Sequence, residues 1–294
     1  MVVARVDGAG SPRRALTMGH TSGGSGRSKV SRVILVTGAS SGIGQACADH
    51  LSRAGWTVIG ASRRGTSSGH WNPLVMDVDD DESVAQGLAS SIVEHGRLDA
   101  VLACAGWGLA GAVEHTSINE AKSQLETNFW GAVRVVQASL PVMRRQGGGR
   151  IVLMSSIGGV IGIPFQAFYS ASKFAMEGYG EALAYEVAPF DIDVTLVQPG
   201  NFRTDFTTNR IEVHSPDDDP YAGAVAKAVG IMAHDEANGA APEAVAEVVE
   251  RVLNAKRPPR RISVGKLDER VGILGKRFLP YRLFERAARG SLGV

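Results

Sequence analysis

The stretch Val33–Gly55, VILVTGASSGIGQACADHLSRAG, decides the fold of this chain. It begins with a short apolar run that ends in glycine, as a strand buried inside a parallel sheet does. From Ile43 it continues with the apolar spacing of a helix, and Gly55 can cap that helix. Between them lies the glycine-rich turn Thr37–Gly44, TGASSGIG. The stretch therefore predicts a strand, a phosphate-binding type of turn and a helix.

Strand and helix signals alternate along the rest of the chain, which is typical of a parallel sheet covered by helices. Further strands are predicted at 57–62, 74–78, 98–106, 149–156, 192–200 and 260–265. Helices are predicted at 81–96, 119–145, 165–188 and 242–255. We expect one doubly wound α/β domain of the Rossmann type over residues 32–265, with about seven parallel strands and helices on both faces.

The N-terminal residues 1–31 differ from the rest in composition. They are rich in Gly, Ser and Arg and lack apolar periodicity, which predicts a disordered tail. No apolar region follows the pair Arg13–Arg14, which argues against a twin-arginine signal. A transit peptide is a minor alternative, and either Met1 or Met18 can be the start of translation.

Two segments near the C-terminus are predicted to lie outside the central sheet. Residues 201–240 follow a strand's carboxyl end, and we expect them to form a mobile lid, with a structureless loop as the alternative. Residues 266–294 form a basic extension, and Lys256–Val294 holds eleven Lys and Arg against three acids. A docked terminal helix with a solvated charged face is the favoured interpretation. Contact with a membrane surface or a partner is the alternative.

The composition excludes several classes of protein. The net charge of +1 gives no general attraction to nucleic acid, and no apolar run is long enough to span a bilayer. Cys47 and Cys104 lie in apolar surroundings without metal-type spacing, which favours a reducing, cytoplasmic location and no disulfide. The histidines show no metal-ligand pattern, so no metal is expected.

The turn and the end of the second strand together predict a nucleotide. Gly38, Gly42 and Gly44 allow a tight turn and a close approach of the backbone to a pyrophosphate. Where NAD-binding chains place an acid, this one has Ser62, Arg63 and Arg64. Guanidinium groups can bind a 2′-phosphate that a carboxylate would repel, so NADP is predicted over NAD. Two ordinary surface arginines are the alternative.

Tyr169 and Lys173 lie one helical turn apart in YSASK. This spacing alone occurs by chance in many helices, but here other motifs accompany it. In order along the chain these are TGASSGIG at 37–44, MDV at 76–78, ACAG at 103–106, TNFWG at 127–131, MSSIGG at 154–159 and QPGNFRTDF at 198–206. Together they resemble the short-chain dehydrogenase/reductase family, of its classical type, over about Val33–Val264. The C-terminal half resembles the branch with hydroxysteroid- and retinol-dehydrogenase-like members.

The resemblance implies a set of site residues. Catalytic roles fall to Asn128, Ser156, Tyr169 and Lys173. Cofactor contacts fall to Gly38, Ser40, Ser41, Gly42, Ile43, Gly44, Ser62, Arg63, Arg64, Asp77, Val78, Ala105, Gly106, Pro199, Gly200 and Thr204, besides Asn128, Tyr169 and Lys173. Trp107, Phe202 and Phe206 are candidates for substrate contact, whereas Trp56, Trp71 and Trp130 are expected in the packing. Cys104 departs from the family, which has an asparagine there that braces the sheet.

The implied reaction is hydride transfer between a carbonyl and a primary or secondary alcohol, with NADP(H) as cofactor and a lipophilic or bulky substrate. Tyr169 would be the general acid and base, and Ser156 would bind the substrate oxygen. The charge of Lys173, with that of an oxidised nicotinamide, is expected to lower the pKa of Tyr169. Asn128 would hold a water in a proton relay. A 3-oxoacyl-thioester reductase and a non-catalytic NADP sensor are the alternatives, and a homo-oligomer is compatible with the family.

Overall fold

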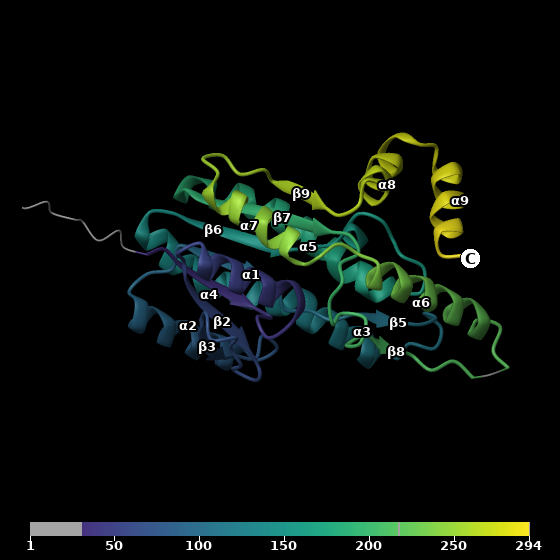
Figure 1. Ribbon diagram of the computed structural model, residues 1–294, viewed down its shortest axis with the longest axis horizontal. Coiled ribbons are helices and arrows are strands. Elements are labelled where there is room, and N and C mark those ends of the chain that lie inside the picture. The colour runs from purple at the N-terminus through teal and green to yellow at the C-terminus, as the bar shows by residue number, and fades with distance from the viewer. Residues whose placement is uncertain (1–30, 217, 294) are drawn as a thin grey trace, which may run out of the picture. The chain divides into compact units, whose positions relative to one another are not determined.

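The computed structural model describes residues 31–216 and 218–293, so the predicted tail at 1–31 lies outside the described residues except for Ser31. Seven parallel strands form one sheet in the order β3-β2-β1-β4-β6-β7-β9 (Figure 1). The strands are β1 (Val33–Thr37), β2 (Thr57–Ser62), β3 (Asn72–Val75), β4 (Ala100–Ala103), β6 (Gly149–Met154), β7 (Ile192–Pro199) and β9 (Arg261–Val264). The predicted fold class is confirmed.

Helices cover both faces of this sheet, because its central strands carry apolar side chains on both of their sides. In β1, Val33 and Leu35 join one core cluster, and Ile34 and Val36 join the other. The first core lies under α2 (Asp81–His95), α4 (Gly131–Gln146) and α5 (Ala167–Val187). The second lies under α1 (Gly42–Arg53) and α7 (Glu243–Asn254).

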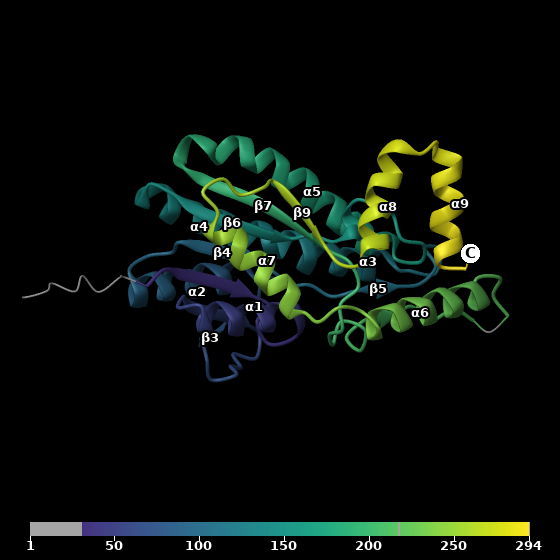
Figure 2. The same cartoon turned by 45° about the horizontal axis from the view of Figure 1, so that its top comes forward.

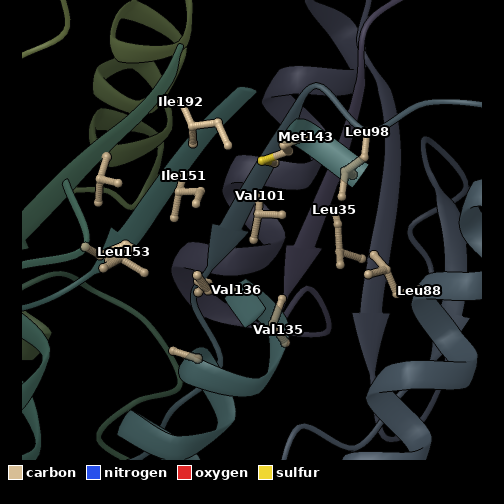
Figure 3. Packing of buried hydrophobic residues seen from close by; sticks show 14 of the residues in the cluster. Leu35, Leu88, Leu98, Val101, Val135, Val136, Met143, Ile151, Leu153 and Ile192 are labelled. Carbon is tan, nitrogen blue, oxygen red and sulfur yellow. The ribbon is translucent and has the colours of Figure 1, made fainter. Parts of the chain in front are cut away.

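Figure 3 shows how tightly the first core is filled. Leu35, Val101 and Ile151 come from three neighbouring strands and are at most 1% exposed. Val136 and Met143 of α4 pack against this layer and are fully buried. Burial of this kind contributes roughly 2 kcal/mol per large side chain. The sheet is therefore a rigid platform, and its carboxyl edge can hold a site.

Several predicted elements differ in extent from the observed ones, among them the strand predicted at 98–106, which is β4 at Ala100–Ala103. The strand predicted at 74–78 is β3 at Asn72–Val75. Met76 and Val78 lie in the loop that follows β3, and their side chains are buried in the first core. Pro73 fits this position because β3 is an edge strand, where a missing N–H costs little. The helix predicted at 119–145 divides into α3 (Ile118–Leu125), a π-helical turn at Glu126–Trp130 and α4.

The segment predicted as a lid contains regular structure. It includes β8 (Ile211–Glu212), which pairs with β5 (Leu109–Ala110) in a separate two-stranded sheet. It also includes α6 (Ala222–Ala237), a helix of 16 residues. The structureless alternative is therefore wrong, while mobility of the segment stays a prediction. Asp217 of the acidic run lies outside the described residues.

The basic extension forms two helices, α8 (Leu267–Phe278) and α9 (Tyr281–Ser291), rather than one docked helix (Figure 2). The helical path is interrupted between them at Pro280, because the proline ring fixes φ and the residue has no backbone N–H to donate. Neither helix has a buried residue. Of the helices in the described residues, none has the length and apolar character needed to cross a membrane.

Candidate active site

The glycine turn after β1 has the geometry of a phosphate cradle. Gly38 and Gly42 have φ values of 70° and 56°, in the region that favours glycine. A Cβ on Gly44 would lie 2.2 Å from the carbonyl oxygen of Gly38, so α1 can begin here only with glycine. The side chain of Ser41 caps no backbone group of α1. The first-turn N–H groups and this hydroxyl are thus suited to bind a phosphate.

The end of β2 presents the two arginines at the rim of the site. The Gly65 N–H donates to the carbonyl oxygen of Ser62 at 3.2 Å and to its hydroxyl at 3.1 Å, which closes a tight turn. Arg63 and Arg64 occupy the centre of this turn and are exposed. Both line the same cavity as the glycine turn. The arrangement can bind a phosphate on the adenosine side of a dinucleotide.

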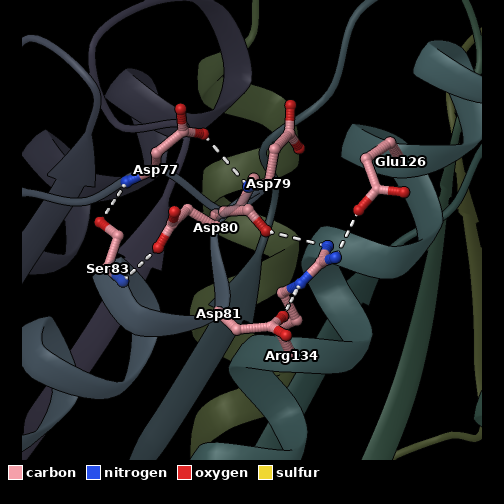
Figure 4. A network of polar contacts seen from close by, with 8 residues as sticks. Asp77, Asp79, Asp80, Asp81, Ser83, Glu126 and Arg134 are labelled. Carbon is pink, nitrogen blue, oxygen red and sulfur yellow. Dashed lines mark hydrogen bonds and ion pairs between the residues drawn. The ribbon is translucent and has the colours of Figure 1, made fainter.

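Asp77 lies in a polar network below this rim (Figure 4). Its backbone N–H donates to the Ser83 hydroxyl at 2.9 Å, and its carboxylate accepts from the Asp79 N–H at 3.1 Å. Arg134 of α4 donates to the Val78 carbonyl at 3.3 Å and also binds the carboxylates of Asp81 and Glu126. The loop after β3 is thereby held against α4 and the turn before it, which carries Asn128.

The four catalytic candidates converge at the carboxyl edge of the sheet. Tyr169 and Lys173 lie in the first two turns of α5, and Ser156 lies just after β6. Tyr169 is 9% exposed, and Ser156 is hydrogen-bonded to it. The Lys173 Nζ lies 5.9 Å from the centroid of the Tyr169 ring and donates to the Met154 carbonyl at 2.8 Å.

The electrostatics of this pair differ from the sequence-based expectation. Burial raises the pKa of Tyr169 to about 12, and the hydrogen bond with Ser156 only partly opposes the rise. Burial also lowers the pKa of Lys173 to about 8. The expected lowering of the pKa of Tyr169 is therefore wrong for the chain alone, because desolvation outweighs the neighbouring charges. The effect of an oxidised nicotinamide stays a prediction.

Asn128 is placed by the π-helical turn between α3 and α4. Its side-chain oxygen accepts the Trp107 N–H at 3.0 Å, and its amide nitrogen donates to the Trp107 carbonyl at 3.0 Å and to the Ser172 hydroxyl at 3.3 Å. It is 1% exposed. Such turns are frequent at functional sites, because the extra residue turns a side chain inward. Asn128 thus braces the loop after β4 against α5, and the water relay stays a prediction.

The loop that carries Cys104 is attached to the end of β1 through backbone groups, which do not depend on the side chain at position 104. The Thr37 hydroxyl accepts the backbone N–H groups of Cys104 at 3.0 Å and Ala105 at 3.1 Å. Burial raises the pKa of the Cys104 thiol to about 11, although Lys173 opposes the rise. Cys104 is therefore a protonated thiol at neutral pH, which argues against a role as a nucleophile.

The lid segment contacts the catalytic tyrosine directly. The rings of Phe206 and Tyr169 pack edge to face with centroids 5.7 Å apart. Arg210 lies over the other side of this group, 5.9 Å from the Phe206 centroid, and forms an ion pair with Glu236 of α6. The Arg210 side chain is 1% exposed. The charge of Glu236 raises the pKa of Tyr169 and that of Arg210 lowers it, which places this pair near the phenol.

A single cavity of about 1130 Å³ joins these features. All of the predicted cofactor, catalytic and substrate residues line it, including Trp107 and Phe206. Phe202 lines it too, but is 4% exposed and belongs to the core under α7. Trp56 and Trp71 are buried as expected. Trp130 does not line the cavity either; it is 48% exposed, and its ring packs edge to face on Phe129 with centroids 4.9 Å apart.

Some residues of the site carry no signal in the sequence. Thr37 was part of the glycine motif, but its bond to the loop after β4 joins residues 67 apart. Arg210 and Glu236 are 26 residues apart, and no motif links them. The cavity also reaches α9, where Phe284 and Leu292 line it. Basic and apolar alternation in the extension was visible, but not its contact with the site.

Comparison with known proteins agrees with this geometry. The sequence profile of the short chain dehydrogenase family matches residues 32–214. A 3-ketodihydrosphingosine reductase from Bacteroides thetaiotaomicron is 43% identical over 260 residues, which cover 88% of this chain and 97% of that protein. Retinol dehydrogenase 8 from Bos taurus is 36% identical over 252 residues, which cover 78% of this chain and 80% of that protein.

Among solved structures, a short-chain dehydrogenase from Streptomyces avermitilis superposes with a TM-score of 0.76 and 33% identity. The match covers 90% of this chain and 99% of that one. NAD or NADP is the typical cofactor of such proteins, and the glycine turn with the free cap of α1 fits either. The chain therefore belongs to the short chain dehydrogenase family and is an oxidoreductase that acts on carbonyl and alcohol groups.

Proposed function

We propose that the protein is an NADP(H)-dependent reductase of a lipophilic ketone, with Tyr169 as the proton donor. The observation that carries the proposal is the position of Tyr169, which is buried beside Ser156 in a cavity of about 1130 Å³. Its pKa of about 12 keeps the phenol protonated at neutral pH. Bound NADPH supplies a hydride to the carbonyl carbon. The phenol of Tyr169 gives its proton to the carbonyl oxygen, which Ser156 holds by a hydrogen bond.

Lys173 supports this role through its charge. With a pKa of about 8 it is positively charged at neutral pH. Loss of the phenol proton leaves a tyrosinate, and a positive charge one helical turn away stabilises it. Lys173 also lines the cavity and can donate to a ribose hydroxyl of the cofactor. The bond to the Met154 carbonyl keeps its Nζ in place.

For the substrate we propose a long-chain 2-amino ketone of the 3-ketodihydrosphingosine class. The similar protein from Bacteroides thetaiotaomicron bears the name 3-ketodihydrosphingosine reductase. The walls of the cavity on the lid and α8 carry the carboxylates of Asp235, Glu236, Asp268 and Glu269, and among them only the cation Lys266. An ammonium group next to the reacting carbonyl would be attracted to these carboxylates. Glu236 is already paired with Arg210, so Asp235 and Asp268 are the carboxylates that remain for such a group.

Two other functions were open from the sequence. A non-catalytic NADP sensor would not need Ser156, Tyr169 and Lys173 together, and the structure brings all three to one wall. A 3-oxoacyl-thioester reductase would need room for a thioester carrier and would gain nothing from an acidic cavity. Turnover with thioester and amino-ketone substrates of equal chain length distinguishes the three.

The first prediction concerns Tyr169. Tyr169→Phe should reduce kcat of NADPH-dependent ketone reduction by about a thousandfold or more, because the proton donor is lost. The affinity for NADPH, measured by fluorescence titration, should change by less than about threefold, since the ring still packs against Phe206. Retention of more than a tenth of the turnover would exclude Tyr169 as the donor. A ketone lacking the amine serves as a parallel substrate: equal kcat/KM for both ketones would reject the amino-ketone assignment alone.

The second prediction concerns the cofactor. Replacing Arg63 and Arg64 with serine should raise KM for NADPH by about tenfold or more, because a phosphate loses its charged donors. KM for NADH should stay within about twofold, which makes NADH the matched control. Steady-state kinetics with each cofactor provide the measurement. If both Michaelis constants rise together, the arginines do not select for the 2′-phosphate.

A further inference from the structure

The C-terminal hairpin, defined as residues 266–293, which include α8, α9 and their link, exposes an unusual amount of apolar surface. Seven of the seventeen exposed large hydrophobic side chains in the described residues lie between 267 and 283. Four of them, Leu267, Val271, Leu274 and Phe278, follow the spacing i, i+4, i+7 and i+11 along α8 and are 53–74% exposed. This spacing places them on one face of the helix. Leu279, Tyr281 and Leu283 continue the apolar surface into the link and α9.

The opposite side of the hairpin is attached to the body of the protein. The Glu269 carboxylate accepts the backbone N–H groups of Asn201 at 2.9 Å and Lys266 at 2.8 Å. The Lys276 Nζ donates to the Val160 carbonyl and lies 4.8 Å from the centroid of the Phe174 ring. On α9, Phe284 and Ala288 line the active-site cavity. The apolar stripe of α8 is therefore not the face by which the hairpin docks onto its own chain.

The hairpin is also strongly basic. Residues 266–293 hold seven Lys and Arg against three acids, a net charge of +4, whereas the whole chain has a net charge of only +1. All seven basic side chains are exposed. Arg282, Arg286 and Arg289 form a stripe at i, i+4 and i+7 on α9. A hairpin that exposes an apolar stripe on one helix and clustered arginines on the other has the composition of a segment that binds a bilayer with anionic head groups.

We propose that the C-terminal hairpin docks on a membrane surface that contains anionic lipid. The apolar side chains of α8 would enter the boundary between head groups and acyl chains, and the arginines of α9 would bind phosphate groups there. A second copy of the chain fits less well, because a twofold interface would bring one +4 hairpin against another. Nucleic acid would leave the apolar stripe without a partner. The proposal does not depend on the substrate, since it concerns a face outside the cavity.

The test uses the full chain and two kinds of vesicle, one of phosphatidylglycerol mixed with phosphatidylcholine and one of phosphatidylcholine alone. Wild-type protein should sediment with the anionic vesicles and much less with the neutral ones. The double variant L274E/F278E should bind the anionic vesicles at least tenfold more weakly. The triple variant R282Q/R286Q/R289Q should bind about a hundredfold more weakly, because each basic residue contributes about fivefold near an anionic surface.

Val93→Glu is the matched control, because Val93 is 88% exposed on α2, away from the hairpin, and receives the same kind of charge. It should bind vesicles as the wild type does. Circular dichroism and thermal melting establish that each variant is folded. Failure of the wild type to bind anionic vesicles overturns the proposal. Binding of both hairpin variants as tight as that of the wild type overturns it too. Sedimentation velocity tests the alternative that a second copy of the chain binds this face. If the wild-type protein does not bind vesicles and is a dimer, and if L274E/F278E is a monomer while the control stays dimeric, the face pairs two copies instead.

Discussion

Lys173 shows at the scale of one residue how burial and function oppose each other. It is 6% exposed, and burial lowers its pKa to about 8 from the ordinary value of 10.5. At pH 7 the folded state therefore holds a charge that is better solvated in the unfolded chain. The difference in pKa corresponds to a cost of about 3 kcal/mol. In the proposed reaction this charge stabilises the tyrosinate that forms at Tyr169.

This cost predicts how stability depends on pH. Between pH 8 and 10.5 the unfolded chain binds a proton at Lys173 that the folded chain lacks, so the free energy of unfolding rises with pH. Lys173→Met should be inactive but more stable than wild type by about 2 kcal/mol at pH 7, once the lost bond to the Met154 carbonyl is deducted. Urea unfolding at pH 7 and pH 9.5 measures the difference, which should fall by about 2 kcal/mol. A difference that does not change with pH would show that Lys173 keeps an ordinary pKa and stays charged in the folded state up to pH 9.5.

At this scale the sequence was informative wherever a motif fixed the spacing. Ser156, Tyr169 and Lys173 could be predicted because their order and gaps resemble a family pattern. The direction of the pKa of Tyr169 could not be predicted, because it depends on how much solvent the fold excludes. Arg210 and Glu236 could not be predicted either, since each is an ordinary charged residue until the chain brings them together.

At the scale of elements, short irregular pieces decide where the side chains of the site lie. The π-helical turn at Glu126–Trp130 turns Asn128 inward, and the glycine turn starts α1 close to β1. Apolar periodicity predicts long helices and buried strands, but one extra residue in a turn leaves that periodicity almost unchanged. For the same reason the strand expected at 74–78 was displaced. Met76 and Val78 are buried although they lie in a loop, and apolar periodicity cannot distinguish a buried loop from a strand.

The glycine turn gives a prediction of its own. Gly44→Ala would place a Cβ 2.2 Å from the Gly38 carbonyl oxygen, so α1 must shift away from the turn. Affinity for NADPH should fall by about tenfold or more, and the free energy of unfolding by about 2 kcal/mol. Gly178→Ala on α5 is the control, because a Cβ there meets no atom within 4 Å. It should be neutral or more stable by about 1 kcal/mol. Fluorescence titration and urea unfolding separate the two results, and equal NADPH affinity in both variants would contradict the cradle.

At the scale of the whole molecule, the cavity connects three segments that are far apart in the sequence. The cofactor turn follows β1, the lid with Phe206 follows β7, and α9 lies near the end of the chain. The alternation of strands and helices predicts this sheet and its carboxyl edge, because parallel strands need crossovers. It does not predict that the last helix reaches the site, because nothing local marks a contact between residues so far apart.

The hairpin and the cavity together predict a dependence on membrane composition, which rests on both proposals. A long-chain ketone presented in anionic vesicles should be reduced at a rate that follows its mole fraction in the lipid, not its bulk concentration. The variant L274E/F278E should lose this dependence, because these side chains lie outside the cavity and act only in docking. Its rate with the same ketone in neutral detergent micelles should match wild type. The measurement is a titration of vesicles at a constant mole fraction of ketone. If the rate of the variant depends on mole fraction as that of the wild type does, docking by the hairpin is not needed for reduction of the ketone in the membrane.

The small sheet of β5 and β8 has a consequence for how this enzyme can change over generations. The Ile211 N–H donates to the Gly108 carbonyl at 2.9 Å, and the Val213 N–H donates to the Ala110 carbonyl at 2.8 Å. These bonds use only main-chain atoms, so they place no demand on which side chains the lid carries. Mutations of Phe206 or its neighbours can therefore change the cavity wall beside Tyr169 while the lid keeps its attachment. Substitutions at a few lid positions can therefore accumulate without loss of the folded structure.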